Sequence, residues 1–167
     1  MSELALAAFL DDALGDHVSL TVEPMTGGGS CEVFGLERGG ERWVLRRAPA
    51  HASSSTAHDV TREFRLLDAI KDTGVRIPRP IVACDDPEVF GAPFYVMERI
   101  DGEPVRAGVP VAWTKEPEHQ HCAFEELLDA IADVHAVDWR AAGLDGFGHP
   151  DRFLERQVSR WLAQLDS

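Results

Sequence analysis

CEVFGLERGGERWVLRR, residues 31–47, holds two runs of apolar residues that are separated by Gly39 and Gly40. Two glycines between such runs are typical of a tight β-hairpin, because glycine adopts the positive φ angles of the turn at little steric cost. Toward the N-terminus, residues 18–25 carry apolar side chains at alternate positions, which indicates another strand. The sequence therefore predicts three consecutive antiparallel strands.

The flanking segments predict helices and further strands. Residues 4–14 and 57–72 place apolar side chains at the spacing of amphipathic helices. Residues 81–84 and 94–97 are expected to be strands, and residues 85–88 form an acidic turn between them. This order of elements predicts an α+β lobe in which one helix packs on an antiparallel five-stranded sheet.

The chain also divides along its length. Residues 102–119 are rich in glycine, proline and charge, which is typical of a linker. On either side of it we expect an N-terminal lobe at 1–101 and a helical region at 120–167. Within the helical region, 120–137 and 152–165 have the spacing of amphipathic helices, and the first presents a broad apolar face.

The composition argues against several classes of partner. The 167 residues carry a formal net charge of −13, whereas binding to nucleic acid or to an anionic membrane needs a surplus of Lys and Arg. The three cysteines form no Cys-x-x-Cys pair, and we find neither a signal peptide nor a membrane-spanning run. We therefore expect a cytoplasmic protein with reduced cysteines and with no nucleic-acid or membrane partner.

Four segments resemble the aminoglycoside phosphotransferase family, in sequence and in order along the chain. They are Gly27-Gly28-Gly29-Ser30, Val44-Leu45-Arg46-Arg47, Arg62-Glu63-Phe64 with Ile77-Pro78-Arg79-Pro80, and residues 94–102, FYVMERIDG. A later segment, LERQVSRW at 154–161, is most similar to the branch whose members are fused to acyl-CoA dehydrogenases. The resemblance implies a protein-kinase-like N-terminal lobe that binds ATP with Mg²⁺, followed by the first helices of a C-terminal lobe.

The resemblance also implies roles for individual residues near the phosphates. Backbone N–H groups of Gly27, Gly28, Gly29 and Ser30 would approach the phosphates, although taken alone this segment reads as a plain turn. Arg46 would hold the phosphates, with Arg47 as the other candidate on the same strand. Strand alternation places the two arginines on opposite faces.

Glu63 is the expected partner of Arg46, since kinases orient the basic residue of the third strand with a helix glutamate. Its neighbours one helical turn away include no basic residue, so the helix itself supplies no partner. The alternative is a solvated surface glutamate.

Residues 97–102 resemble the hinge between the two lobes of a kinase. The resemblance implies that Met97, Glu98 and Ile100 meet the adenine, with the Glu98 carbonyl and the Ile100 N–H as the groups that bind it. The simpler interpretation is an edge strand that ends in a turn at 101–102, and the two are compatible.

Other titratable residues do not predict a catalytic or metal centre. His119, His121 and Cys122 have no fourth ligand at suitable spacing, and His135 is expected to pack in the C-terminal lobe. The family's His-Gly-Asp, with its following Asn and Asp, supplies the base and the Mg²⁺ ligands, and His149-Pro150-Asp151 resembles it only superficially. We therefore expect a fragment without catalytic residues or magnesium ligands, and no phosphate transfer by this chain alone.

Three functions remain open on the sequence. The first is the nucleotide-binding lobe of a phosphotransferase that acts, in the full-length enzyme, on a small hydroxylated metabolite. The second is a non-catalytic binding or assembly module, which would self-associate through the exposed helix at 120–137. The third is a lobe of this shape that binds no nucleotide.

Overall fold

The computed structural model describes residues 2–25, 31–49, 59–102, 105, 108, 110–148 and 151–165. These residues form two compact units, Met1–Val137 and Asp138–Ser167, and each unit is considered by itself. The lobe boundary expected at 102–119 stays a prediction.

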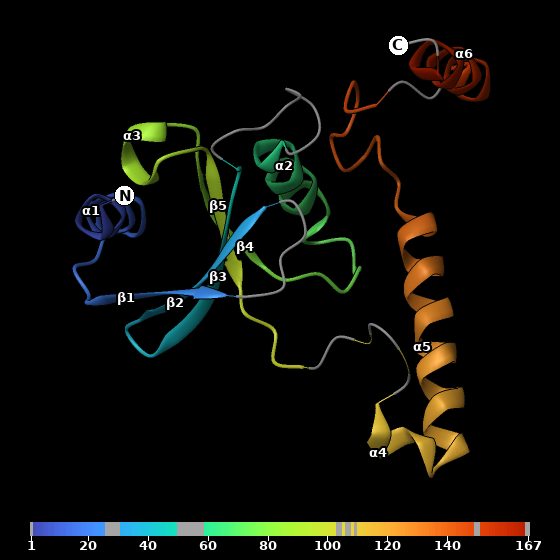
Figure 1. Ribbon diagram of the computed structural model, residues 1–167, viewed down its shortest axis with the longest axis horizontal. Helices are drawn as coiled ribbons and strands as arrows, with labels where there is room; N and C mark the ends of the chain where they lie inside the picture. The colour runs from blue at the N-terminus through green and yellow to red at the C-terminus, as the bar shows by residue number, and fades with distance from the viewer. Residues whose placement is uncertain are drawn as a thin grey trace. The chain divides into compact units, whose positions relative to one another are not determined.

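The first unit is built around a five-stranded antiparallel sheet (Figure 1). Its strands are β1 (Leu20–Met25), β2 (Glu32–Arg38), β3 (Glu41–Arg47), β4 (Pro80–Cys84) and β5 (Phe94–Glu98). They are arranged in the order β1-β2-β3-β5-β4, so β5 lies between β3 and β4. The structure thus confirms the predicted α+β class and the antiparallel sheet.

The turn between β2 and β3 forms where the two glycines predicted it. Arg38 pairs with Glu41, and Gly39 and Gly40 occupy the turn with φ angles of 57° and 84°. Both angles are in the left-handed region, which residues with a Cβ rarely adopt. The glycine pair therefore sets the register of the hairpin.

One face of the sheet is covered by α1 (Glu3–Leu14) and α3 (Pro87–Phe90). Ser2 caps α1 by accepting a hydrogen bond from the Ala5 N–H, and Gly15 ends the helix with a φ of 73°. The larger core lies on this face. Its buried residues are Leu6, Leu10, Phe34, Leu36, Trp43, Leu45, Cys84, Phe90, Phe94 and Val96.

The opposite face of the sheet is covered by α2 (Val60–Ile70), which Asp59 caps by accepting from the Arg62 N–H (Figure 1). A smaller core of Cys31, Val60 and Tyr95 lies beneath it. The prediction of one packed helix is thus correct for this face only. Residues 85–88, expected as a turn, instead include the start of α3, because the Asp86 side chain caps it.

The region expected as a linker also contains helices. The helix α4 (Val111–Thr114) precedes the longer helix α5 (Pro117–Ala136), which begins three residues earlier than the sequence predicts. A proline occupies the first turn of α5, where its missing N–H costs no helical hydrogen bond. The second unit contains α6 (Phe153–Leu165).

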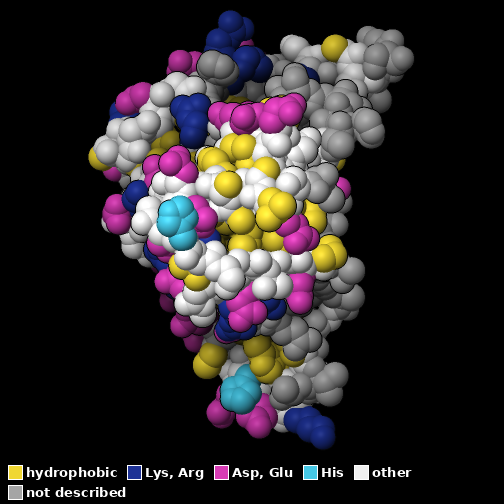
Figure 2. Space-filling view, turned by 90° about the vertical axis from the view of Figure 1, so that its left-hand side faces the viewer, with side chains coloured by type: hydrophobic (Ala, Val, Ile, Leu, Met, Phe, Trp, Pro, Cys, Tyr) yellow, Lys and Arg dark blue, Asp and Glu magenta, His cyan; other side chains and the backbone are white. Residues whose placement is uncertain are grey.

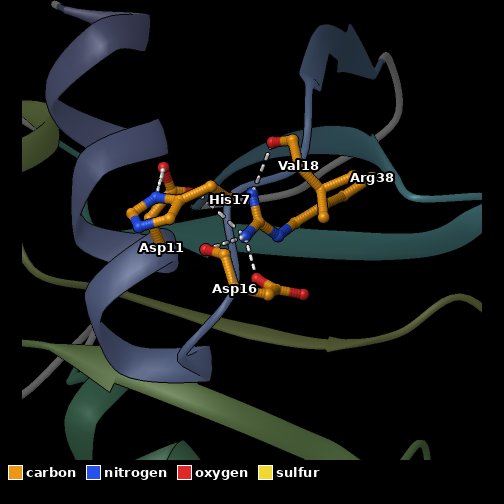
Figure 3. Close-up of polar contacts among 5 residues, drawn as sticks. All are labelled: Asp11, Asp16, His17, Val18 and Arg38. Atoms are coloured by element: carbon orange, nitrogen blue, oxygen red, sulfur yellow. Dashed lines mark hydrogen bonds and ion pairs between the residues drawn. The ribbon is translucent and has the colours of Figure 1, made fainter.

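A cluster of polar side chains joins the end of α1 to β2 (Figure 3). The guanidinium of Arg38 is buried and donates to the Val18 carbonyl at 2.8 Å and to Asp16. It also pairs with Asp11 Oδ1 at 2.9 Å, while His17 Nδ1 lies 3.0 Å from Asp11 Oδ2. Ion pairs and hydrogen bonds of Arg38 thus attach α1 to the sheet, in addition to apolar packing.

This cluster predicts a loss of stability in acid. The hydrogen bond to His17 is the main cause that lowers the pKa of Asp11 below 3.8, with Arg38 adding to it against the effect of burial. A carboxylate whose pKa is lowered on folding stabilises the protein fully above its unfolded-state pKa, and this contribution is lost as the pH falls through the folded-state pKa. The midpoint of urea unfolding should therefore drop between about pH 5 and pH 3, and less steeply in Asp11→Asn.

The control for this experiment is Asp12→Asn, which removes an exposed carboxylate from the same helix. It should keep the wild-type pH dependence. Equal slopes for wild type and Asp11→Asn would show that the cluster does not couple folding to pH.

Acidic side chains are spread over the face shown in Figure 2, around a central group of hydrophobic ones. These exposed acidic side chains contribute to the formal net charge of −13. In the part of the chain that the structure describes, no helix combines the length and the apolar character needed to cross a membrane.

Candidate functional site

Strand β3 places its two C-terminal arginines on opposite faces of the sheet. Arg47 points into the larger core, where its guanidinium carbon lies 5.0 Å from the ring centroid of Phe34 and 4.9 Å from that of Phe90. It also donates to Glu32 Oε2 at 2.8 Å and to the Phe90 carbonyl at 2.6 Å. The contacts of Arg47 are thus with the core of the protein, and Arg46 is the one of the two that lies on the sheet face covered by α2.

Arg46 meets the glutamate that the sequence assigned to it. Its Nη2 lies 3.3 Å from Glu63 Oε2 and 3.4 Å from Oε1, so one nitrogen contacts both oxygens. Both side chains are about one-third exposed, at 34% and 40%. The structure therefore brings a strand arginine and a helix glutamate together at the edge of the smaller core, while their role toward a nucleotide stays a prediction.

Tyr95 is also part of this site, although the sequence alone did not predict a role for it. It pairs with Arg46 across β3 and β5, and its hydroxyl donates to Glu63 Oε2 at 3.1 Å. One signal was available: it is the only tyrosine of the chain, and a hydroxyl within an apolar strand needs a partner. Burial raises the pKa of Tyr95 well above its usual value, so the phenol stays protonated and donates.

The environment of Arg46 suits a bound anion. Burial works to lower its pKa, but the Cys31 thiol, Tyr95 and Glu63 more than compensate, so the pKa is raised and the guanidinium stays charged. Its Nε is buried and has no hydrogen-bond partner among the described residues. A buried donor without a partner is costly, whereas the exposed third of the Arg46 side chain is the part that an anion could contact.

Residues paired across antiparallel strands share a face of the sheet. On the face of Arg46 they form an apolar strip, which consists of Met25, Val33, Val44 and Met97. Met25 pairs with Val33, which pairs with Arg46, and Val44 pairs with Met97. All four apolar side chains of this strip are partly exposed. A flat apolar ring could therefore lie on the strip with a charged group reaching Arg46.

The predicted hinge follows the strip directly. Glu98 ends β5, its N–H donates to the Arg79 carbonyl at 2.8 Å, and its side chain accepts from the Arg79 N–H at 3.2 Å. Ile100 is 64% exposed, and its N–H makes no backbone hydrogen bond within the described residues. The role of Met97, Glu98 and Ile100 toward an adenine stays a prediction.

Several predicted positions cannot be placed or have other partners. Gly27, Gly28, Gly29 and Ser30 lie outside the described residues, as do His149 and Pro150. His119 lies 3.2 Å from Glu116, and His121 lies 3.2 Å from Glu125 on the same helix. No group of three or more His, Cys, Asp or Glu residues in the described ranges is arranged to hold a metal ion.

A basic residue on the third strand of an antiparallel sheet, paired with a helix glutamate, is the arrangement of a kinase-like N-terminal lobe, and arginine stands here in place of the usual lysine. The fold matches a solved structure from Ralstonia eutropha JMP134, described as a candidate aminoglycoside phosphotransferase, with a TM-score of 0.80 and 29% identity. That match covers 99% of this chain and 47% of the other. The chain belongs to the phosphotransferase enzyme family, whose family model matches residues 21–167.

Curated relatives point to the same branch as the segment at 154–161. Acyl-CoA dehydrogenase family member 11 of Gallus gallus is 35% identical over 150 residues, which are 89% of this chain and 19% of that protein. The protein of the same name from Rattus norvegicus is 31% identical over 169 residues, or 98% of this chain and 21% of that protein. The chain thus spans about a fifth of the length of these relatives, and the predicted similarity to the dehydrogenase-linked branch is confirmed.

Proposed function

We propose that this chain is the ATP-binding lobe of a small-molecule phosphotransferase. The observation that carries the proposal is the pairing of Arg46 with Glu63 on the sheet face that α2 leaves partly open. Arginine is always charged and can contact phosphate oxygens through two N–H groups at once. Membership of the phosphotransferase enzyme family supports the same assignment.

The groups along this face of the sheet match the adenine and the phosphates of ATP in the order in which they follow one another. The apolar strip would receive the adenine, and the Glu98 carbonyl and Ile100 N–H would bind its edge. Arg46 would hold the α- and β-phosphates, oriented by Glu63. Mg²⁺, when bound, would neutralise phosphate charge, and we expect its ligands to come from outside this chain.

The reaction of the full-length enzyme would be transfer of the γ-phosphate to a hydroxyl group. We propose a small hydroxylated metabolite as the acceptor and the cytoplasm as the location. The names of the curated relatives identify no acceptor, and the description of the solved structure applies to that protein, so aminoglycosides are not proposed.

Calorimetric titration of the chain with ATP and Mg²⁺ tests the proposal. We expect saturable binding, together with weaker binding of adenosine, which retains the ring but lacks the phosphates. Equal affinity for ATP and adenosine would exclude the phosphate-holding role of Arg46. The absence of any binding would favour the assembly module instead.

The second candidate, a non-catalytic assembly module, is favoured by the exposed apolar face of α5. Its five large apolar side chains are 45–59% exposed, and they are Phe124, Leu127, Leu128, Ile131 and Val134. Monomeric proteins rarely leave such a face uncovered, so a second copy is the proposed occupant.

Light scattering tests this candidate. At micromolar concentration the chain should have a mass above that of one copy, and Leu128→Glu with Ile131→Glu should restore the monomer. Leu4→Glu is the matched control, because Leu4 is 84% exposed on α1 rather than on α5. A monomeric wild-type chain would count against the assembly module.

A further inference from the structure

We propose that Tyr95 is a positioning residue, which holds the Glu63 carboxylate and, through it, keeps Arg46 in place for the nucleotide phosphates. The inference rests on the proposed ATP site and assigns it a residue that touches neither nucleotide nor metal.

Both contacts that Glu63 makes with its neighbours on the sheet are longer than charge-assisted hydrogen bonds usually are. Arg46 reaches it through a single nitrogen at 3.3 and 3.4 Å, beyond the usual distance of a charged N–H···O bond. The Tyr95 hydroxyl is the other donor, at 3.1 Å from Oε2. Because the Glu63 side chain is 40% exposed, losing the hydroxyl would leave it able to turn toward water.

Tyr95 itself is firmly held. Its residue is 2% exposed, and its ring centroid lies 6.0 Å from that of Phe64 on α2. Its backbone is paired with Arg46 in the sheet, so the register places the two residues opposite each other on the same face. The hydroxyl therefore connects a rigid strand to a helix side chain, which is what a positioning residue must do.

The geometry also separates the tasks of the two donors. A glutamate bound by Arg46 alone could keep its contact only if the two side chains moved together. With Tyr95 also holding one carboxylate oxygen, Arg46 contacts Glu63 through Nη2 and has further N–H groups for a ligand.

The test is Tyr95→Phe, which removes the hydroxyl and keeps the ring against Phe64. We expect ATP to bind roughly 3- to 10-fold more weakly and adenosine to bind as in the wild type, since only the phosphate contact depends on Glu63. In a Glu63→Ala background, which removes the acceptor, the same substitution should have little further effect, because the two residues act through one contact.

Thr61→Val is the matched control. The Thr61 hydroxyl donates to Asp85 Oδ1 at 2.7 Å, so this variant also removes a hydroxyl that attaches α2 to the sheet region, away from Glu63. It should leave ATP binding unchanged. An equal loss in Thr61→Val and Tyr95→Phe would mean that general loosening of α2 explains the effect and would overturn the inference.

The remaining outcomes separate this inference from the proposed function. If Arg46→Ala weakens ATP binding and Tyr95→Phe does not, the ATP site stands and the role of Tyr95 is wrong. If the loss in Tyr95→Phe persists fully in Glu63→Ala, Tyr95 does not act through Glu63. If the wild-type chain binds no ATP, both proposals fail together.

Discussion

Replacing Arg46 by alanine is expected to weaken the binding of ATP by roughly 10- to 100-fold, because charge-assisted hydrogen bonds contribute about 1.5–3 kcal/mol. Affinity for adenosine should not change, since it lacks the phosphates that Arg46 would contact. The side chain is 34% exposed and its contact with Glu63 is long, so the fold should lose at most about 1 kcal/mol. Calorimetry gives the affinities and urea unfolding gives the stability.

A charge-matched variant makes this result specific. Arg65→Ala removes an exposed positive charge from α2, two residues along the chain from Glu63. If nonspecific attraction between the protein and the negative ATP were responsible, both variants would bind ATP more weakly by the same factor. Unchanged ATP affinity in Arg46→Ala would show that the phosphate assignment is wrong.

Replacing the neighbouring Arg47 by alanine should instead cause a large loss of stability. The substitution removes the cation between Phe34 and Phe90, leaves the Phe90 carbonyl without this donor, and opens a cavity in the larger core. Together these effects should lower the free energy of unfolding by about 2–4 kcal/mol. Urea unfolding followed by circular dichroism measures the change.

Arg47→Met separates packing from polar contacts. Methionine fills part of the space between the rings but cannot donate to Glu32 or to Phe90, so we expect an intermediate loss of stability. ATP affinity of the folded fraction should equal that of the wild type. A stable Arg47→Ala protein that has lost ATP binding would reverse the roles given to the two arginines.

Much of the fold follows from local sequence, as particular residues show. The glycines at 39 and 40 predict the hairpin because few other residues adopt the two positive φ angles that the turn contains. Ser2 and Gly15 predict the ends of α1 because they supply the cap groups that a helix lacks. One error was local, because Asp86 caps a short helix where a turn was expected. The other concerned tertiary packing, because the apolar spacing of α1 did not show that this helix covers a face of the sheet.

The candidate site was predictable only in part. Residue alternation placed Arg46 and Arg47 on opposite faces, and the lack of a local partner for Glu63 indicated a distant one. Neither observation says which face α2 covers. That depends on how the sheet and helix pack, and the structure shows it through the contact of Glu63 with Arg46.

The sequence by itself determined the five strands, the longer helices α1, α2, α5 and α6, and their order, because capping, turn geometry and apolar spacing act over a few residues. Its motifs also indicated the family to which the chain belongs. Tertiary structure alone decided that Arg46 faces α2, that Arg47 is buried, and that Tyr95 reaches Glu63. The physical reason is the strand order: β5 pairs with β3 across a long stretch of chain, and its register places Tyr95 opposite Arg46. No local pattern encodes a pairing between segments so far apart.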